Sequence, residues 1–330
     1  ITLVMEEKQD MEPVSYVLKR GEYDQPGEEV GPAVPAALPA MGDELPRNRV
    51  GLARWLSAPE NPLTARVTVN RFWQELFGTG LVKSTEDFGV MGEPPSHPEL
   101  LDWLSAEFME SGWDVKHLFR LMVTSATYRQ SSASDAEARE RDPENRLLGR
   151  GPRFRLDAEM LRDQALFVSG LLVDRVGGPP VKPYQPSGLW KVVAYPKSDT
   201  ANFKQDAGDK LYRRSLYTFW KRTSPPPNMA IFDAPERESC IARRERTNTP
   251  LQALVLMNDV QFMEAARKFA ERVLREGGDH SEARADFAFQ SVLARQPSAT
   301  ERSRLVRLLE EKRALFQEDE TAVEALLKVG

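Results

Sequence analysis

Residues 97–123, HPELLDWLSAEFMESGWDVKHLFRLMV, decide the fold class of this chain. Two amphipathic segments follow one another here, the first after His97 and Pro98 and the second after Asp114. In each, apolar residues recur at i, i+3, i+4 and i+7, which is the period of one face of an α-helix. Gly112 lies between them, where a helix typically stops. The stretch therefore predicts two helices packed around a shared core.

The same pattern extends upstream. Asn48 is a favoured N-cap residue ahead of one apolar-periodic segment, and Asn61 and Pro62 give a second N-cap and first-turn pair. Gly78 follows the second segment as a stop signal. We expect four amphipathic helices around one core in this region. Their apolar faces carry three tryptophans that we predict to be core residues: Trp55, Trp73 and Trp103.

Outside this region, the helical periodicity of the sequence is interrupted several times. Residues 1–47 show little helical periodicity, since two strand-like segments precede a stretch rich in Pro, Gly and Ala. Asp157 starts a helix that we predict to reach about Val176. Residues 179–210 lack a helix period, and SLYTFW at 215–220 favours a strand because it is β-branched and aromatic. An irregular insertion is therefore expected between two helical regions.

Helical periodicity returns at Thr249, and Ser298 with Glu301 forms a further capping box. These patterns predict a mainly α, multi-helix globular domain with a β-containing N-terminal arm and an irregular, partly β insertion. The predicted divisions are the extended arm, a helical region, the insertion with an arginine-rich motif, and a C-terminal helical region on the same core: 1–47, 48–178, 179–248 and 249–330.

Composition limits the function classes. The 330 residues are 41% hydrophobic and 29% charged, which is ordinary globular composition. A formal net charge of −5 argues against a general nucleic-acid binder, which is usually basic. One cysteine allows no intrachain disulfide, and no apolar run approaches the roughly 18 residues of a membrane span. A start at Ile1 without a methionine or signal region predicts a processed piece or fragment.

The stretch FDAPERESCIARRERTNTPLQAL at 232–254 combines the most specific side chains of the chain. Thr249, Pro250 and Gln252 predict a capped helix start. Arginines just ahead of a helix start make an anion site, because free N–H groups and guanidinium groups both attract oxyanions. The alternative, which leads, is that the arginines bridge carboxylates of neighbouring helices. The candidate ligand-binding residues are Arg243, Arg244, Arg246, Asn248 and Thr249.

Aromatic residues crowd the insertion, and exposed rings there could stack on sugars or pin the loop to the core. The rings that we assign to the ligand site are Trp190, Tyr195 and Trp220. Asp233 and Glu236 are weak candidates for a catalytic carboxylate pair. Cys240 is expected to be a small buried packing residue rather than a nucleophile.

The three histidines are better explained by local structure than as ligands, since His97 is a helix cap, His117 lies early in a helix and His280 borders a Gly-Gly turn, so no metal site is predicted.

Two long segments carry a family resemblance: NRVGLARWLSAPENPLTARVTVNRFWQELFGTGLVKSTEDFGVMGEPPSHPELLDWL and RRERTNTPLQALVLMND. They resemble the planctomycete-type domain of unknown function 1553, which lies toward the C-terminus of large cytochrome-c-associated proteins. The resemblance covers roughly 47–275, and LKRGEYDQPGE resembles the usual lead-in. It implies an exported, periplasmic or secreted protein with a haem-c domain upstream. This chain has no CxxCH motif, so no cofactor is expected within it and any haem belongs to another part of the polypeptide.

The leading functional hypothesis is a non-catalytic interaction or ligand-binding module of an exported redox-associated protein. Its expected partners are upstream domains of the same polypeptide and an acidic, glycan-like polymer. The first alternative is a hydrolase that acts on an envelope or extracellular polymer through carboxylates near Asp233. The second is a purely architectural domain.

Overall fold

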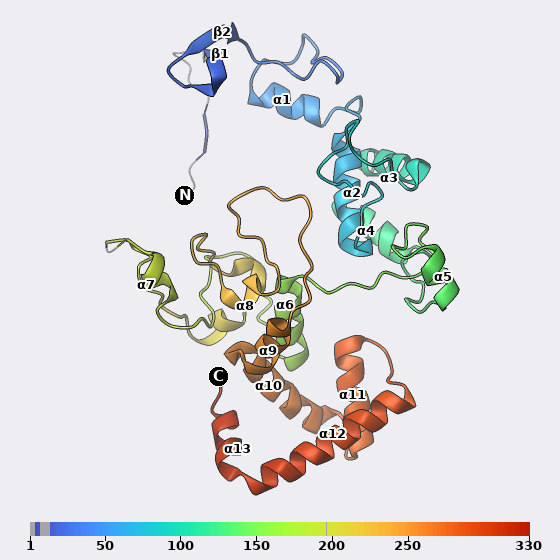
Figure 1. The fold of residues 1–330 in the computed structure, drawn as a ribbon, viewed down its shortest axis with the longest axis vertical. Helices are drawn as coiled ribbons and strands as arrows, with labels where there is room; N and C mark the ends of the chain where they lie inside the picture. The colour runs from blue at the N-terminus through green and yellow to red at the C-terminus, as the bar shows by residue number, and fades with distance from the viewer. Residues whose placement is uncertain (1–3, 7–13, 196) are drawn as a thin grey trace. The chain divides into compact units, whose positions relative to one another are not determined.

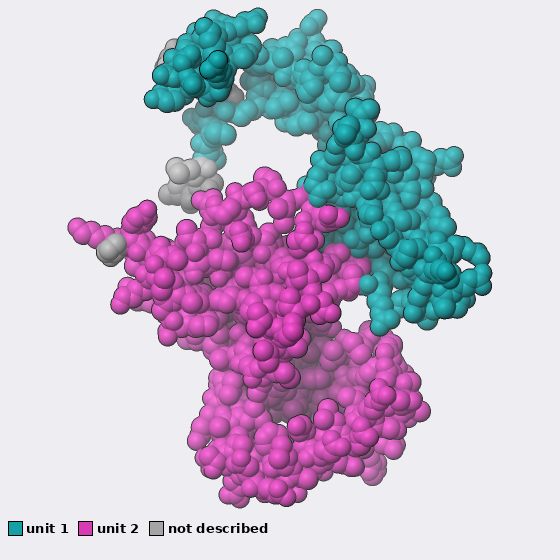
Figure 2. Space-filling model, viewed as in Figure 1, with its two compact units in different colours: residues 1–153 teal, residues 154–330 magenta. Residues whose placement is uncertain are grey.

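The computed structural model describes residues 4–6, 14–195 and 197–330. Thirteen α-helices and one small antiparallel sheet lie in these ranges, so the predicted mainly α class is confirmed (Figure 1). The chain divides into two compact units, residues 1–153 and 154–330, which Figure 2 colours separately. No described helix has the length and apolar character needed to cross a bilayer.

The N-terminal arm of the first unit holds the sheet. Strand β1, Ser15–Leu18, pairs antiparallel with β2, Pro26–Val30, across a short 3₁₀ turn at Lys19–Gly21. The strand expected in VSYVLKR is therefore confirmed. Residues 4–6 of the other predicted strand, ITLVMEE, form none, and its remaining residues lie outside those that the structure describes.

Four helices follow, as the apolar periodicity predicts. They are α1 (Arg49–Leu56), α2 (Thr64–Phe77), α3 (Pro98–Glu110) and α4 (Val115–Thr124). The side chains of Asn48 and Asp114 accept hydrogen bonds from the first backbone N–H groups of α1 and α4. Asn61 accepts from the N–H groups of Leu63 and Thr64, and α2 begins at Thr64, slightly later than predicted.

One apolar cluster joins α2, α3 and α4. Its buried members include Val69, Trp73, Leu101, Leu104, Phe108, Leu118 and Met122. Asn70 is also buried, and its amide pairs with both backbone groups of Val82, which secures the loop after α2. Trp55 is buried on α1, but the prediction that Trp103 is a core residue is wrong, because it is 52% exposed on the outer side of α3. The short helix α5, Ala136–Arg141, lies in the polar excursion after α4.

The second unit begins with α6, Ala158–Ser169. The prediction that this helix reaches Val176 is wrong, because Gly170 adopts φ = 78° and ends it in the left-handed conformation that glycine favours.

The strand expected at 215–220 is also wrong, since Ser215–Tyr217 is a 3₁₀ turn and Thr218 makes only an isolated bridge to Val181. Side chains of α6 bind the backbone at the start of this segment and just before it. Asp163 accepts from the N–H of Ser215, and Arg162 donates to the carbonyl groups of Leu211 and Arg213.

Between α6 and the C-terminal helices the chain is irregular, with short elements at Leu189–Val193 (α7), Gly208–Tyr212 (3₁₀) and Pro227–Ala230 (α8). The C-terminal helices are α9 (Pro250–Asn258), α10 (Val260–Glu276), α11 (Ser281–Leu293), α12 (Ala299–Glu318) and α13 (Glu320–Leu327). Helix α10 packs on α6, and α11 packs on α12 (Figure 1). A second core joins α6, α8 with the turn after it, and α10; it is formed by Ala158, Met229, Phe232, Ala234 and Phe262.

Candidate functional site

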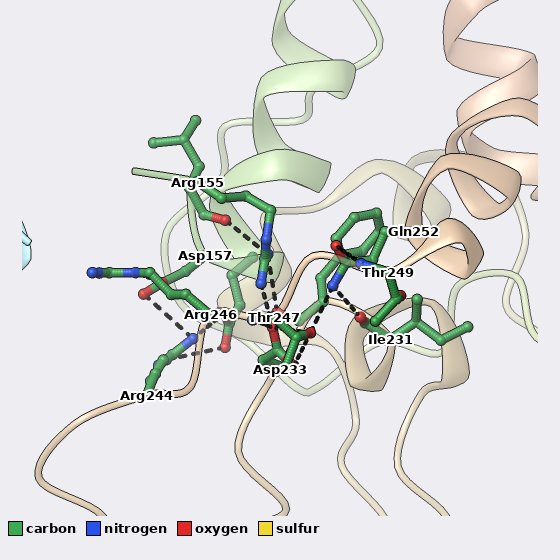
Figure 3. A network of polar contacts seen from close by, with 12 residues as sticks. Arg155, Asp157, Ile231, Asp233, Arg244, Arg246, Thr247, Thr249 and Gln252 are labelled. Atoms are coloured by element: carbon green, nitrogen blue, oxygen red, sulfur yellow. Dashed lines mark hydrogen bonds and ion pairs between the residues drawn. The ribbon is translucent and has the colours of Figure 1, made fainter. Parts of the chain in front are cut away.

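The arginine-rich motif folds into a polar network within the second unit, which we call the arginine seam (Figure 3). It joins the start of α6, the turn after α8 and the segment that leads into α9. Its members are Arg155, Asp157, Glu159, Asp233, Arg244, Arg246 and Thr247.

Asp233 lies at the centre of the seam. Its backbone adopts φ = 62° in the turn that ends α8, a conformation that Asp tolerates better than most residues. The carboxylate accepts hydrogen bonds from the backbone N–H of Thr247 at 2.8 Å and from its hydroxyl at 2.8 Å. It also pairs with the guanidinium of Arg155, which donates in addition to the carbonyl of Phe232 at 3.2 Å. Both carboxylate oxygens of Asp233 are therefore occupied by groups of this chain.

Arg244 and Arg246 are directed to carboxylates at the start of α6. Arg244 Nη1 lies 2.6 Å from Glu159 Oε2 and 3.6 Å from Asp157 Oδ2. Arg246 Nε lies 3.8 Å from Asp157 Oδ1, and its guanidinium carbon lies 4.3 Å from the ring centroid of Phe154. The two arginines thus bridge carboxylates of a neighbouring helix, as in the structural interpretation of the motif.

The predicted capping box of α9 is confirmed. The N–H of Thr249 donates to Gln252 Oε1 at 3.3 Å. Gln252 is buried, and its Nε2 donates to the carbonyl of Ile231 at 2.9 Å and to the hydroxyl of Thr247 at 3.0 Å. The helix start is thereby tied to the same turn that carries Asp233.

The other residues predicted from this motif lie at the surface. Arg243, Asn248 and Glu236 are exposed, and Cys240 is exposed too, so the expectation that it is a buried packing residue is wrong. It lies in an irregular segment that contributes no side chain to either core. A catalytic pair of Glu236 and Asp233 would have to use a carboxylate of Asp233 that already binds Arg155 and Thr247.

The three aromatic candidates have different surroundings. Trp190 is 2% exposed and packs against Phe203 and Phe219, with ring centroids 5.1 Å and 5.5 Å away, so its role is to anchor the insertion. Trp220 packs on the second core and donates from Nε1 to the carbonyl of Glu236. Only Tyr195, 85% exposed, offers a ring face to solvent among these three.

Two neighbouring cavities lie in the insertion, and neither was predicted from the sequence. The outer cavity, which we call the insertion cleft, measures about 400 Å³. Its lining includes Gln185, Trp190, Lys191, Asn202, Phe203 and Gln205. The inner cavity is narrow, with a volume of about 10 Å³, close to the space of a single water. Its lining includes Arg162, Lys182, Gln185, Phe203, Thr218 and Asn228. Gln185 and Phe203 line both.

The charged side chains that line these two cavities are all positive, namely Arg162, Lys182 and Lys191. Neither cavity has an Asp or Glu among the described residues that line it. The ammonium of Lys182 lies 5.3 Å from the ring centroid of Phe219, and that of Lys221 lies 5.0 Å from that of Trp190. Lys182, Lys191 and Lys221 take part in no ion pair within the described part of the chain. Burial lowers the pKa of Arg162 to about 10, which leaves this guanidinium charged at neutral pH.

Three buried polar atoms near the cavities have no hydrogen-bond partner in the described structure: Gln185 Nε2, Trp190 Nε1 and Thr218 Oγ1. Sequence reasoning named Trp190 as a candidate but missed Gln185 and Thr218. The three residues come from α7 and from two loops, so no local spacing relates them. The same holds for Asp157 and Glu159 in the seam, since Glu159 meets Arg244 across a separation of 85 residues.

His97 and His117 have different polar partners. His97 Nδ1 lies 3.0 Å from Ser96 Oγ, and His117 Nε2 lies 2.7 Å from Glu107 Oε1 between α3 and α4. In the described ranges no three His, Cys, Asp or Glu side chains are placed to share a metal ion.

Comparison with known proteins gives one match. The model of the family PSD1, described as "Protein of unknown function (DUF1553)", matches residues 48–309. No curated protein and no solved structure matches the chain. The matched range includes α1 to α4, the insertion and the whole arginine seam.

Proposed function

We propose that this chain, which belongs to the PSD1 family of proteins of unknown function (DUF1553), is a non-catalytic ligand-binding module whose ligand is an anionic, acidic-glycan-like polymer. The insertion cleft is the observation that carries the proposal. A cavity of about 400 Å³ at the surface has room for a sugar unit, and amides of Gln185, Asn202 and Gln205 suit hydroxyl groups. The lysines around it favour a negatively charged polymer.

The arginine seam has a supporting role in this proposal. Arg244 and Arg246 hold the segment before α9 against α6, and Asp233 holds the turn after α8. The seam thereby fixes the C-terminal end of the insertion against the start of α6. Arg243, Asn248 and Thr249, first assigned to an anion site, belong to the segment that the seam fixes. Tyr195 is the aromatic candidate whose exposed ring is available for stacking on a sugar.

Calorimetric titration with oligogalacturonate and with a neutral oligosaccharide of equal length tests the proposal. We expect the wild type to bind the acidic oligomer more tightly, and Lys191→Ala to weaken that binding by about two- to fivefold, as for one exposed charge contact. Lys312→Ala removes the same charge from the exposed face of α12 and should leave binding unchanged. Failure of the wild type to bind, or equal binding by Lys191→Ala, would sink the proposal.

The family resemblance leads us to propose in addition that the protein is exported to the periplasm or secreted, and that its partner is a haem-c domain upstream in the same polypeptide. Fractionation of cells that make the native protein, followed by a haem stain of the full-length band, tests both points. A band confined to the cytoplasm, or one without haem, would contradict them.

A second candidate function is architectural. It is favoured by α9, on which Leu251, Leu254 and Met257 are exposed rather than buried. If this face holds a neighbouring domain, Leu254→Ser should separate the domains in limited proteolysis of the full-length protein without changing saccharide binding. No comparable observation favours hydrolysis, because the carboxylate of Asp233 is fully engaged within the seam.

A further inference from the structure

We propose that the inner cavity is an oxyanion pocket, which takes one oxygen of a carboxylate or sulfate group on a saccharide bound in the insertion cleft. The inference rests on the proposed function, since it names the group of the polymer that this site recognises. Gln185 and Thr218 would donate to that oxygen, and Lys182 would supply the charge.

Two buried polar atoms without a hydrogen-bond partner are the first observation that supports this pocket. Buried polar groups in native proteins nearly always have a hydrogen-bond partner, so those without one require an explanation. Thr218 is 7% exposed, its Oγ1 has no partner in the described structure, and it lines the inner cavity. Gln185 Nε2 is likewise buried without a partner, on a residue that lines both cavities. A hydroxyl and an amide NH₂ group can both donate to one acceptor oxygen.

The size of the inner cavity sets what can enter. A volume of about 10 Å³ accepts one atom of water size and excludes a sugar ring. The adjoining insertion cleft, at about 400 Å³, holds the ring itself. Because Gln185 and Phe203 line both cavities, a substituent that projects from a ring in the cleft reaches the inner cavity along them.

The charge of the pocket favours an anion over a water. Arg162 is held by hydrogen bonds to the carbonyl groups of Arg213 and Leu211, at 2.9 and 2.8 Å, and Asp163 lies 3.8 Å from its Nη1. Its charge is therefore partly balanced. The ammonium of Lys182 forms no ion pair in the described chain, because the carboxylate of Asp206 accepts from the backbone N–H of Lys182 instead, at 2.8 Å, and the rings of Trp190 and Phe219 make cation–π contacts with the ammonium. The remaining positive charge belongs to Lys182.

The test uses the full chain and three probes: hexagalacturonate, the same hexamer as its methyl ester, and a sulfated hexasaccharide. The ester keeps the sugar skeleton and removes the charge. We expect the wild type to prefer the acid over the ester by about tenfold or more, as for hydrogen bonds to a charged group. The sulfated probe decides whether the oxyanion is a sulfate or a carboxylate, because the probe with the natural group binds more tightly.

Gln185→Glu and Thr218→Val are the decisive variants. Gln185→Glu places a negative charge at the entrance of the inner cavity and should abolish the preference for the acid. Gln205→Glu adds the same charge in the outer cleft only and is the matched control, for which we expect a smaller loss. Thr218→Val removes a hydroxyl that has no partner in the described protein, so it should lower the preference about tenfold while the urea midpoint of unfolding stays equal or rises.

The outcomes separate this inference from the proposed function. Equal binding of acid and ester by the wild type would overturn the oxyanion pocket and leave the saccharide cleft intact. Equal losses in Gln185→Glu and Gln205→Glu, or an unchanged preference in Thr218→Val, would also overturn the pocket. Binding of none of the three probes by the wild type would overturn both.

Discussion

At the scale of single residues, two side chains bind partners that the neighbouring sequence does not indicate. Asn70 is buried with both ends of its amide bonded to Val82. Asp233 was a catalytic candidate, and its carboxylate, 15% exposed, instead connects Arg155 with Thr247. The box of Thr249 and Gln252, by contrast, was readable in advance, because its two members are three residues apart.

The contacts of Asp233 predict a stability effect. Asp233→Ala removes the acceptor of the Thr247 N–H and leaves the guanidinium of Arg155 without its carboxylate, so the free energy of unfolding should fall by about 2 kcal/mol. Urea denaturation followed by circular dichroism measures the change. Glu236→Ala, at an exposed position in the next turn, is the control and should stay within about 0.5 kcal/mol. Equal effects of the two variants would show that Asp233 is not a structural centre.

At the scale of elements, helix starts were predictable and helix ends less so. Start signals such as Asn48, Asp114 and Ser298 lie within a few residues of the N–H groups that they cap. Helix α6 ends at one glycine, Gly170, whereas the apolar pattern continues beyond it and predicted a longer helix. The region 215–220 has strand-like composition, but Arg162 and Asp163 of α6 bind the backbone next to it. Such contacts from distant residues override local propensity.

The capping box of α12 predicts a pH dependence. A hydrogen bond from Arg295, followed by one from the backbone of Ser298, lowers the pKa of Glu301 to about 2. Because this pKa is depressed in the folded state, the stabilising contribution is fully present above the ordinary Glu pKa of about 4.3 and is lost as the pH falls toward 2.

We expect the thermal midpoint of the wild type to fall more between pH 5 and pH 2.5 than that of Glu301→Gln, which cannot titrate there. Calorimetry at several pH values measures this difference, and Glu310→Gln on an exposed face of α12 is the control. If Glu301→Gln and the wild type lose stability in parallel, the ion pair with Arg295 does not hold Glu301 ionised.

At the scale of the whole molecule, each compact unit has its own apolar core. One core joins α2, α3 and α4, and the other joins α6, α8 and α10. The division between residues 153 and 154 falls inside the helical region predicted at 48–178. Amphipathic periodicity assigns residues to helices, but it does not tell which helices share a core. The partition therefore needed the structure.

This division predicts that residues 154–330 fold without the first unit. The fragment contains the second core, the complete arginine seam and both cavities of the insertion. We expect a cooperative urea transition and an affinity for oligogalacturonate within about twofold of the full chain. Arg155→Ala should lower the urea midpoint of the fragment and that of the full chain by similar amounts. A non-cooperative transition would mean that the second unit depends on the first.

The arginine seam also bears on how this fold can vary. Arg244 meets Glu159 across 85 residues, so the insertion returns to the start of α6, while the chain leaves the other end of that helix at Gly170. A loop whose two ends are held on one helix can be lengthened, shortened or exchanged without displacing the helices that it joins, because the entropy of closing a loop grows slowly with its length. The insertion is thus the part of this architecture that selection can rewrite most freely, and a grafted insertion with the seam retained should keep the helical framework unchanged.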